Sequence, residues 1–273
     1  MDCSRFLLVT DVDGTLLDHH AVLSPRNKEK IETFMQLGGG FCIASGRSRM
    51  SVQHVLEQTG LHVNRPCILI NGSLLYDYEK GEETERTPLP PTAREVMEQV
   101  LDRFPQVGAE VFLTDGIVPV RDNDLLVHHR KYEEPADSFV ERNLRTAPWG
   151  KLLFAVPPEK MGEVERFCQA LPHSGMKFVA SCDHYYEVMA EQADKGAGVR
   201  ALSRRFGYRR ENIAAIGDYF NDVEMLVAAG IPAVPGNAPD AMKRMFPHVL
   251  CRCEDGAVGE LIEELMARCE RDG

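Results

Sequence analysis

Two carboxylates stand one residue apart near the start of the chain. Asp11 and Asp13 follow the apolar run at residues 6–9, and Gly14 comes next. Four consecutive apolar residues predict a strand buried on both faces, and open α/β sheets bind ligands beyond the carboxyl ends of such strands. Carboxylates this close repel each other unless a cation lies between them, and Mg2+ prefers oxygen ligands. The pattern fits a Mg2+ site with one carboxylate left for chemistry, or an ordinary Asp-Gly turn.

Polar side chains also follow three other apolar runs, and Lys195 stands at the start of a later helical pattern. The runs occupy residues 41–44, 66–70 and 212–216, and they end in Ser45-Gly46-Arg47, Asn71-Gly72 and Gly217-Asp218-Tyr219-Phe220-Asn221-Asp222. Because parallel strands end at the same edge of a sheet, we expect these groups to lie close together. In-line phosphoryl transfer needs a nucleophile, cationic groups around the phosphoryl oxygens and an acid for the leaving group. These residue types predict that reaction.

The apolar runs alternate with helical patterns at both ends of the chain. Ser24 is the expected N-cap of a helix over residues 25–37, with Pro25 at its first position, and a second helix is predicted over 48–59. Strand and helix in this order predict a parallel α/β sheet. The same pattern resumes after Asp194. It adds helices near 222–229 and 240–246, a short strand at 249–251 and a closing amphipathic helix over 257–269.

The middle of the chain has a different pattern, which predicts an inserted α+β domain. A hairpin with its turn at Lys80-Gly81 leads into it, and Asp115-Gly116 marks a second hairpin. The expected strands are 110–114, 117–121, 151–156, 177–181 and 185–189, and the expected helices are 92–104, 122–130, 136–146 and 159–171. We therefore divide the chain into a discontinuous core, residues 1–85 and 190–273, and an insertion, residues 86–189.

The bulk composition is that of a soluble globular protein. The 273 residues are 44% hydrophobic and 27% charged, which suits one large or two modest domains. The net charge of -11 argues against binding to nucleic acid or an anionic membrane. The eight cysteines form no C-x-x-C pair, so we expect reduced thiols rather than disulfides or zinc ligands. With no sustained apolar segment at the N-terminus, we expect a cytoplasmic protein, either monomer or homodimer.

Four ordered stretches resemble the motifs of the haloacid dehalogenase-like superfamily. They are Asp11-Val12-Asp13-Gly14-Thr15, Ala44-Ser45-Gly46-Arg47, Asp194-Lys195-Gly196 and Gly217-Asp218-x-x-Asn221-Asp222. Within the superfamily the chain is similar to the Cof-type phosphatases of sugar phosphates and other small phospho-metabolites. The resemblance covers the whole chain and implies an α/β fold, a Rossmann-like parallel-sheet core with an inserted α+β cap domain.

The resemblance also implies a role for each polar residue. Asp11 would attack phosphorus and form an aspartyl-phosphate, while Asp13 would protonate the leaving oxygen and then activate water. Mg2+ would be held by the Asp11 carboxylate, the Asp13 backbone carbonyl and Asp218. The phosphate- and substrate-binding groups would be Ser45, Gly46, Arg47, Asn71, Lys195 and Asn221. Asp222 would orient Lys195 or a metal-bound water.

Each of these residues also has an ordinary structural explanation. Ser45 and Asp222 would serve as helix caps, and Asp13 and Asn71 would belong to plain turns. Arg47 would lie on the surface or form a structural salt bridge, and Lys195 would be a solvated residue at a helix start. The favoured function is a Mg2+-dependent phosphatase, a phosphoric monoester hydrolase acting on a small phosphorylated metabolite. The alternatives are a sugar phosphomutase, which would use the same motifs, and a non-catalytic phospho-ligand-binding module. The sequence does not identify the substrate, although Glu187 and the surface of the insertion are candidates for selecting it.

Overall fold

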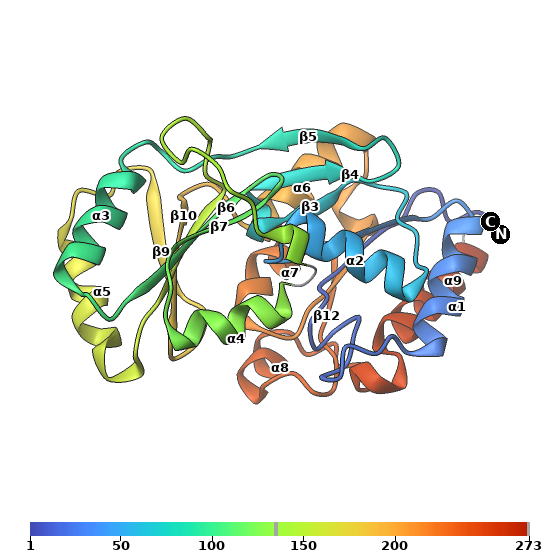
Figure 1. Cartoon of the computed structure of the whole chain (residues 1–273). Helices are drawn as coiled ribbons and strands as arrows, with labels where there is room; N and C mark the ends of the chain where they lie inside the picture. Colours follow the sequence, from blue (N-terminus) through green and yellow to red (C-terminus); the bar gives the residue numbers. More distant parts are fainter. Residues whose placement is uncertain (134–135, 272–273) are drawn as a thin grey trace. The chain divides into compact units, whose positions relative to one another are not determined.

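The computed structural model describes residues 1–133 and 136–271, and the chain divides into two compact units. The first unit comprises residues 1–45, 56–84 and 194–273, and the second comprises residues 46–55 and 85–193. Figure 1 shows the elements of both, coloured along the sequence. Among the described residues, no helix has both the length and the apolar character needed to span a membrane.

A parallel sheet of four strands, in the order β12-β11-β1-β2, forms the centre of the first unit. Strand β1 lies between its two neighbours, with Val9 opposite Ala215 on one side and Cys42 on the other. All four residues of β1 are buried, as a strand covered on both faces requires. The predicted parallel-sheet core is therefore confirmed. The strands are β1 (Leu7–Thr10), β2 (Gly40–Ile43), β11 (Ile213–Ile216) and β12 (Ile231–Ala233).

The third predicted parallel strand is only partly right. It joins β2 through a single parallel bridge, Ala44 with Ile68, and the Ser45 amide donates to the Ile68 carbonyl at 2.8 Å. Otherwise it pairs antiparallel with the next strand, because Asn71 (φ 52°) and Gly72 (φ 94°) turn the chain back. The strands of this second sheet are β3 (Cys67–Leu69), β4 (Leu74–Asp77) and β5 (Glu82–Arg86).

The helices of the first unit pack in two pairs, α1 with α9 and α6 with α7. Pro25 begins α1 as predicted, and Ser24 occupies its N-cap position without a side-chain cap hydrogen bond. The predicted strand at 249–251 is reduced to one bridge between Val249 and Val234. The helices that carry residues of this unit are α1 (Pro25–Gln36), α2 (Arg49–Thr59), α6 (Lys195–Phe206), α7 (Val223–Ala228), α8 (Asp240–Met245) and α9 (Ala257–Arg271).

The second unit is built on an antiparallel sheet in the order β7-β6-β8-β10-β9. Side chains alternate along its strands, so Val111, Leu152 and Val188 share one face and pack in one hydrophobic cluster with residues of α3 and α5. Figure 1 shows these two helices beside the sheet. This is the α+β arrangement predicted for the insertion. Its elements are α3 (Ala93–Arg103), β6 (Gly108–Leu113), β7 (Gly116–Arg121), α4 (Asp124–Tyr132), β8 (Lys151–Ala155), α5 (Met161–Ala170), β9 (Met176–Ala180) and β10 (Tyr185–Ala190).

The helix predicted over 136–146 is wrong. Only Ala136–Ser138 forms a 3-10 turn, η2, and the chain then runs irregularly to the next strand. Arg94 donates to the carbonyls of Leu144 and Ala147, and the Trp149 indole also donates to Leu144. Side chains thus satisfy backbone carbonyls at the end of this irregular segment. The helical partner of the Leu144 carbonyl would be the amide of residue 148, which is a proline and has no N–H to donate.

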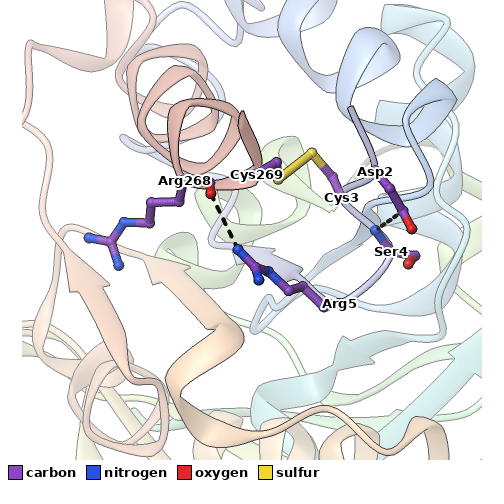
Figure 2. The surroundings of a disulfide bond; sticks show 6 residues. All are labelled: Asp2, Cys3, Ser4, Arg5, Arg268 and Cys269. Atoms are coloured by element: carbon purple, nitrogen blue, oxygen red, sulfur yellow. Dashed lines mark hydrogen bonds between the residues drawn. A yellow bond between two sulfur atoms is a disulfide. The ribbon is translucent and has the colours of Figure 1, made fainter. Parts of the chain in front are cut away.

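A disulfide between Cys3 and Cys269 joins the segment before β1 to helix α9 (Figure 2). The Cα atoms are 5.7 Å apart, within the usual range for such a bond. The expectation of reduced thiols is therefore wrong for this pair, whereas the other six cysteines are free. The two cysteines are 266 residues apart in sequence, so no local spacing could indicate the pairing.

We predict that Cys3→Ser lowers the free energy of unfolding in non-reducing buffer by about 2–4 kcal/mol, because the unfolded chain is no longer closed into a ring. Urea unfolding of the wild type with and without dithiothreitol should show a loss of the same size. The variant itself should be insensitive to dithiothreitol. Equal stability of the wild type in both buffers would contradict the prediction.

Candidate active site

A buried lysine links two carboxylates in the first unit. Lys195 Nζ donates to Asp11 Oδ1 and to Asp222 Oδ1, each at 2.6 Å. Lys195 is 1% exposed, Asp11 6% and Asp222 0%. A charge removed from water is tolerated only when it is paired and hydrogen-bonded, so these three groups depend on one another. They come from three separate motifs of the sequence.

The backbone fixes the positions of Asp11 and Lys195. The Asp11 amide donates to the Ile216 carbonyl at 2.9 Å, which continues the ladder between β1 and β11. Lys195 is the first residue of α6, whose N-cap Asp194 accepts from the Ala197 amide at 2.6 Å. Gly72 packs against this cap, and a Cβ there would lie 2.1 Å from the Asp194 carbonyl oxygen.

Asp222 is held by the loop that follows β11. Its Oδ2 accepts from the Tyr219 amide at 3.1 Å, while its Oδ1 accepts from Lys195. It makes no side-chain cap hydrogen bond to α7, so the capping alternative is not supported and contact with Lys195 is its observed role. Gly217 allows the close packing, since a Cβ there would lie 2.4 Å from the Asp222 carboxyl carbon.

Asp218 is fixed by the turn after β1. Thr15 Oγ1 donates to Asp218 Oδ1 at 3.1 Å. Gly14 has φ 77°, and a Cβ on it would lie 2.7 Å from Asp218 Oδ2. Asn237 Nδ2 donates to the Gly14 carbonyl at 2.7 Å, and Asn237 Oδ1 accepts from the Cys253 amide at 2.9 Å. Sequence reasoning assigned no role to Thr15 or Asn237, although each follows a glycine shortly after an apolar run.

The site carries more negative than positive charge. Burial raises the pKa of Asp11 well above its ordinary value; Lys195 opposes this shift, and the nearby carboxylates add to it. Burial would lower the pKa of Lys195, but Asp11 and Asp222 together raise it, so Lys195 stays protonated. Burial and the neighbouring Asp222 raise the pKa of Asp218 to about 6. A second cation would relieve this excess of carboxylates.

The donor set fits a divalent cation with a preference for oxygen. One carboxylate oxygen each from Asp11, Asp218 and Asp222 lies within 4.8 Å of the others. Both oxygens of Asp222 already accept hydrogen bonds, from Lys195 and from the Tyr219 amide. The geometry therefore favours Asp11 and Asp218 as the ligand pair.

The structure brings some of the other predicted residues together. Ser45 is 1% exposed, and its carbonyl accepts from the Asn71 amide at 3.0 Å, so the ends of β2 and β3 meet there. Asp13 is exposed on the turn after β1. Asn221 is exposed in η5 (Phe220–Asp222).

Gly46 and Arg47 fall in the second unit. Arg47 Nη1 donates to Ser51 Oγ at 3.0 Å, one turn along α2. The Gly46 carbonyl accepts from Lys151 Nζ at 3.4 Å, and Lys151 forms a buried ion pair with Glu187 at 3.0 Å. The charge of Glu187, a candidate for substrate selection, is thus balanced by Lys151.

Glu133 is a further buried acid of the second unit. Its Oε2 accepts from the Ser48 amide at 3.3 Å, and the residue is 4% exposed. Burial raises the pKa of Glu133, although His129, Lys151 and Arg47 pull it the other way. The protonated form is therefore favoured in the folded protein relative to the unfolded chain.

We predict that Glu133→Gln stabilises the protein at high pH but not at low pH. The folded-state pKa of Glu133 lies above the unfolded one, so its proton-linked stability is complete below the unfolded pKa and is lost as pH rises through the folded pKa. Glutamine keeps an acceptor for Ser48 and has no proton to lose. Urea unfolding should show a gain for the variant that grows as pH rises above 4.5, the ordinary pKa of a glutamate. Glu141→Gln, at an exposed acid, is the matched control, and a gain independent of pH would contradict the prediction.

Residues 8–262 match the family model of the haloacid dehalogenase-like hydrolases. Since this match covers most of the chain, the chain belongs to that family. The resemblance inferred from the four motifs is thereby confirmed, and so is the prediction of an enzyme.

Individual relatives agree with this assignment. The chain is 25% identical to pyridoxal phosphate phosphatase YbhA of Escherichia coli, over 87% of this chain and 90% of that protein. It is 27% identical to the HMP-PP phosphatase of Serratia proteamaculans, over 94% of each. A haloacid dehalogenase-like hydrolase from Bacteroides thetaiotaomicron has the same fold, with a TM-score of 0.85, 23% identity and coverage of 95% of this chain and 99% of that one.

Proposed function

We propose that the chain is a Mg2+-dependent phosphatase of small phosphorylated metabolites. The observation that carries the proposal is the hydrogen bond from the buried Lys195 to Asp11, beside the carboxylate of Asp218. The curated relatives support the reaction class, since their names are those of phosphatases acting on pyridoxal phosphate and HMP-PP. A third relative, YitU of Bacillus subtilis, is named as a phosphatase of a phosphoribitylamino-uracil.

Asp11 acts as the nucleophile. Lys195 holds its Oδ1, which leaves Oδ2 to form the bond to phosphorus as the bond to the ester oxygen breaks. Asp13 gives its proton to the departing oxygen, so the products of this step are an alcohol and an aspartyl-phosphate. A water then loses its proton to Asp13 and attacks phosphorus, which releases inorganic phosphate and restores the Asp11 carboxylate. The exposure of Asp13 suits a group that exchanges protons with both the leaving group and water.

The remaining groups hold and neutralise the phosphoryl oxygens. Mg2+ held by Asp11, Asp218 and the Asp13 carbonyl would supply Lewis-acid charge there. Lys195 adds the positive charge that the site keeps at all times. The other phosphate- and substrate-binding groups in this proposal are Ser45, Gly46, Arg47, Asn71 and Asn221, with Asp222 orienting Lys195.

The two parts of the chain have separate tasks in this proposal. Residues 1–85 and 190–273 form the catalytic core, which carries the nucleophile, the acid/base and the metal ligands. Residues 86–189 form the cap, which selects the substrate. The separation is supported by the placement of Asp11, Lys195 and Asp218 in the first compact unit.

We predict that Asp11→Asn lowers kcat for p-nitrophenyl phosphate by at least about a thousandfold, because an amide does not form the aspartyl-phosphate. Release of p-nitrophenol in the presence of Mg2+ measures the effect. Asp102→Asn, at an exposed acid on α3, should keep full activity. Circular dichroism would show that the Asp11 variant is folded, and full activity in that variant would rule out the nucleophile assignment.

We also predict that removing the metal abolishes turnover. Chelation by EDTA should reduce hydrolysis to background, and excess Mg2+ should restore it. Asp218→Asn should raise the Mg2+ concentration needed for half-maximal activity by about tenfold or more, since it removes one anionic ligand. A Mg2+ titration of each variant measures this. Unchanged activity in EDTA would contradict the metal requirement.

A further inference from the structure

Two exposed aromatic side chains stand inside the loop that holds the proposed metal and phosphate ligands. Tyr219 is 45% exposed and Phe220 is 48% exposed, although aromatic rings usually bury most of their surface. They lie between Asp218, a proposed Mg2+ ligand, and Asn221, a proposed phosphate contact. The backbone of both residues therefore lies close to the two proposed ligands, since consecutive Cα atoms are about 3.8 Å apart.

The backbone under these rings is held firmly. The Tyr219 amide donates to Asp222 Oδ2 at 3.1 Å, and the Asp222 amide donates back to the Tyr219 carbonyl at 3.0 Å. Asp222 is fully buried and bonded to Lys195. The aromatic pair is thus presented on a fixed loop, which lowers the cost of ordering it when a ligand binds.

The two rings contact each other edge to face. Their centroids are 5.2 Å apart and their planes make an angle of 74°. Within residues 1–133 and 136–271, neither ring has another aromatic or cationic contact. By contrast, the exposed Phe206 on α6 lies under the guanidinium of Arg65, 5.0 Å from its centroid. Nearly half of the surface of each residue thus remains exposed and available for contact with a planar group.

We propose that Tyr219 and Phe220 bind a planar aromatic leaving group, so that the substrates are phosphomonoesters of aromatic or heteroaromatic alcohols. This inference rests on the proposed phosphatase function. In this proposal, a ring attached to the phosphoryl group through its ester oxygen meets the side chains that begin one and two residues after Asp218. The aromatic pair supplies stacking and edge contacts, whereas a sugar hydroxyl would gain no hydrogen bond from Phe220 and only the phenol group from Tyr219.

Two esters of matched chemistry test the proposal. Benzyl phosphate and cyclohexylmethyl phosphate have leaving groups of similar size and basicity, but only the first is planar. The wild type should prefer benzyl phosphate by about 2- to 10-fold in kcat/KM, mainly through KM. The double variant Tyr219→Leu/Phe220→Leu keeps apolar bulk without a π-face, and it should lose most of that preference.

Controls separate stacking from other effects. Tyr219→Phe should retain the preference, because the ring remains. Phe206→Leu removes an exposed aromatic outside this loop and should also retain it. Calorimetry with benzylphosphonate, which is not hydrolysed, should show weaker binding to the double variant than to the wild type, whatever the activity.

The outcomes distinguish this inference from the phosphatase assignment. Hydrolysis of both esters with no preference in the wild type, or a preference unchanged in the double variant, would overturn the aromatic assignment while leaving the phosphatase intact. No hydrolysis of either ester, with benzylphosphonate binding still weakened by the double variant, would overturn the reaction and keep the aromatic site. A wild-type dimer that dissociates in the double variant, with the ester preference unchanged, would identify the pair as an interface between copies and overturn the proposal.

Discussion

A single buried ammonium group is the constraint on which the first unit depends. Lys195 serves two carboxylates from distant parts of the chain, so the end of β1, the start of α6 and the loop after β11 must arrive together. Loss of any one partner would leave charge buried without compensation. The same contacts keep Asp11 in one orientation, so the interaction that stabilises the site also orients the proposed nucleophile. Fold and site are therefore specified by the same residues.

The sequence predicted candidate site residues best where a polar side chain follows an apolar strand. Such groups stand out against a buried run, and this is why Asp11 and Asp222 could be proposed as site residues before their contacts were known. Lys195 was proposed from its place at the start of a helical pattern, in Asp194-Lys195-Gly196. Thr15 and Asn237 were missed because their importance lies in which backbone or carboxylate they meet, and pattern alone does not contain that information. The irregular segment over 139–146 was missed for a related reason, since distant Arg94 supplies its hydrogen bonds.

The two faces of the sheet in the second unit differ in the side chains that they bury. The alternation of side chains along β6, β8 and β10 directs Val111 and its neighbours toward α3 and α5. The intervening positions carry Glu110, Lys151 and Glu187, which are all buried; Glu110 pairs with Arg130, and Lys151 pairs with Glu187. One face is thus a conventional hydrophobic core, whereas the other combines paired charges with buried apolar side chains such as Phe112 and Leu153.

The bond between Cys3 and Cys269 has a mechanical consequence. It joins positions near opposite ends of the sequence, so nearly the whole polypeptide becomes one covalent ring. Tension applied outside the ring would pass from one sulfur to the other without loading the sheets or helices. A motor protein that pulls a polypeptide through its pore from one end would have to admit two chain segments side by side rather than one. Reduction of the disulfide would open the ring. The redox conditions around the protein would therefore decide whether a pulling force acts on the folded chain between the two cysteines.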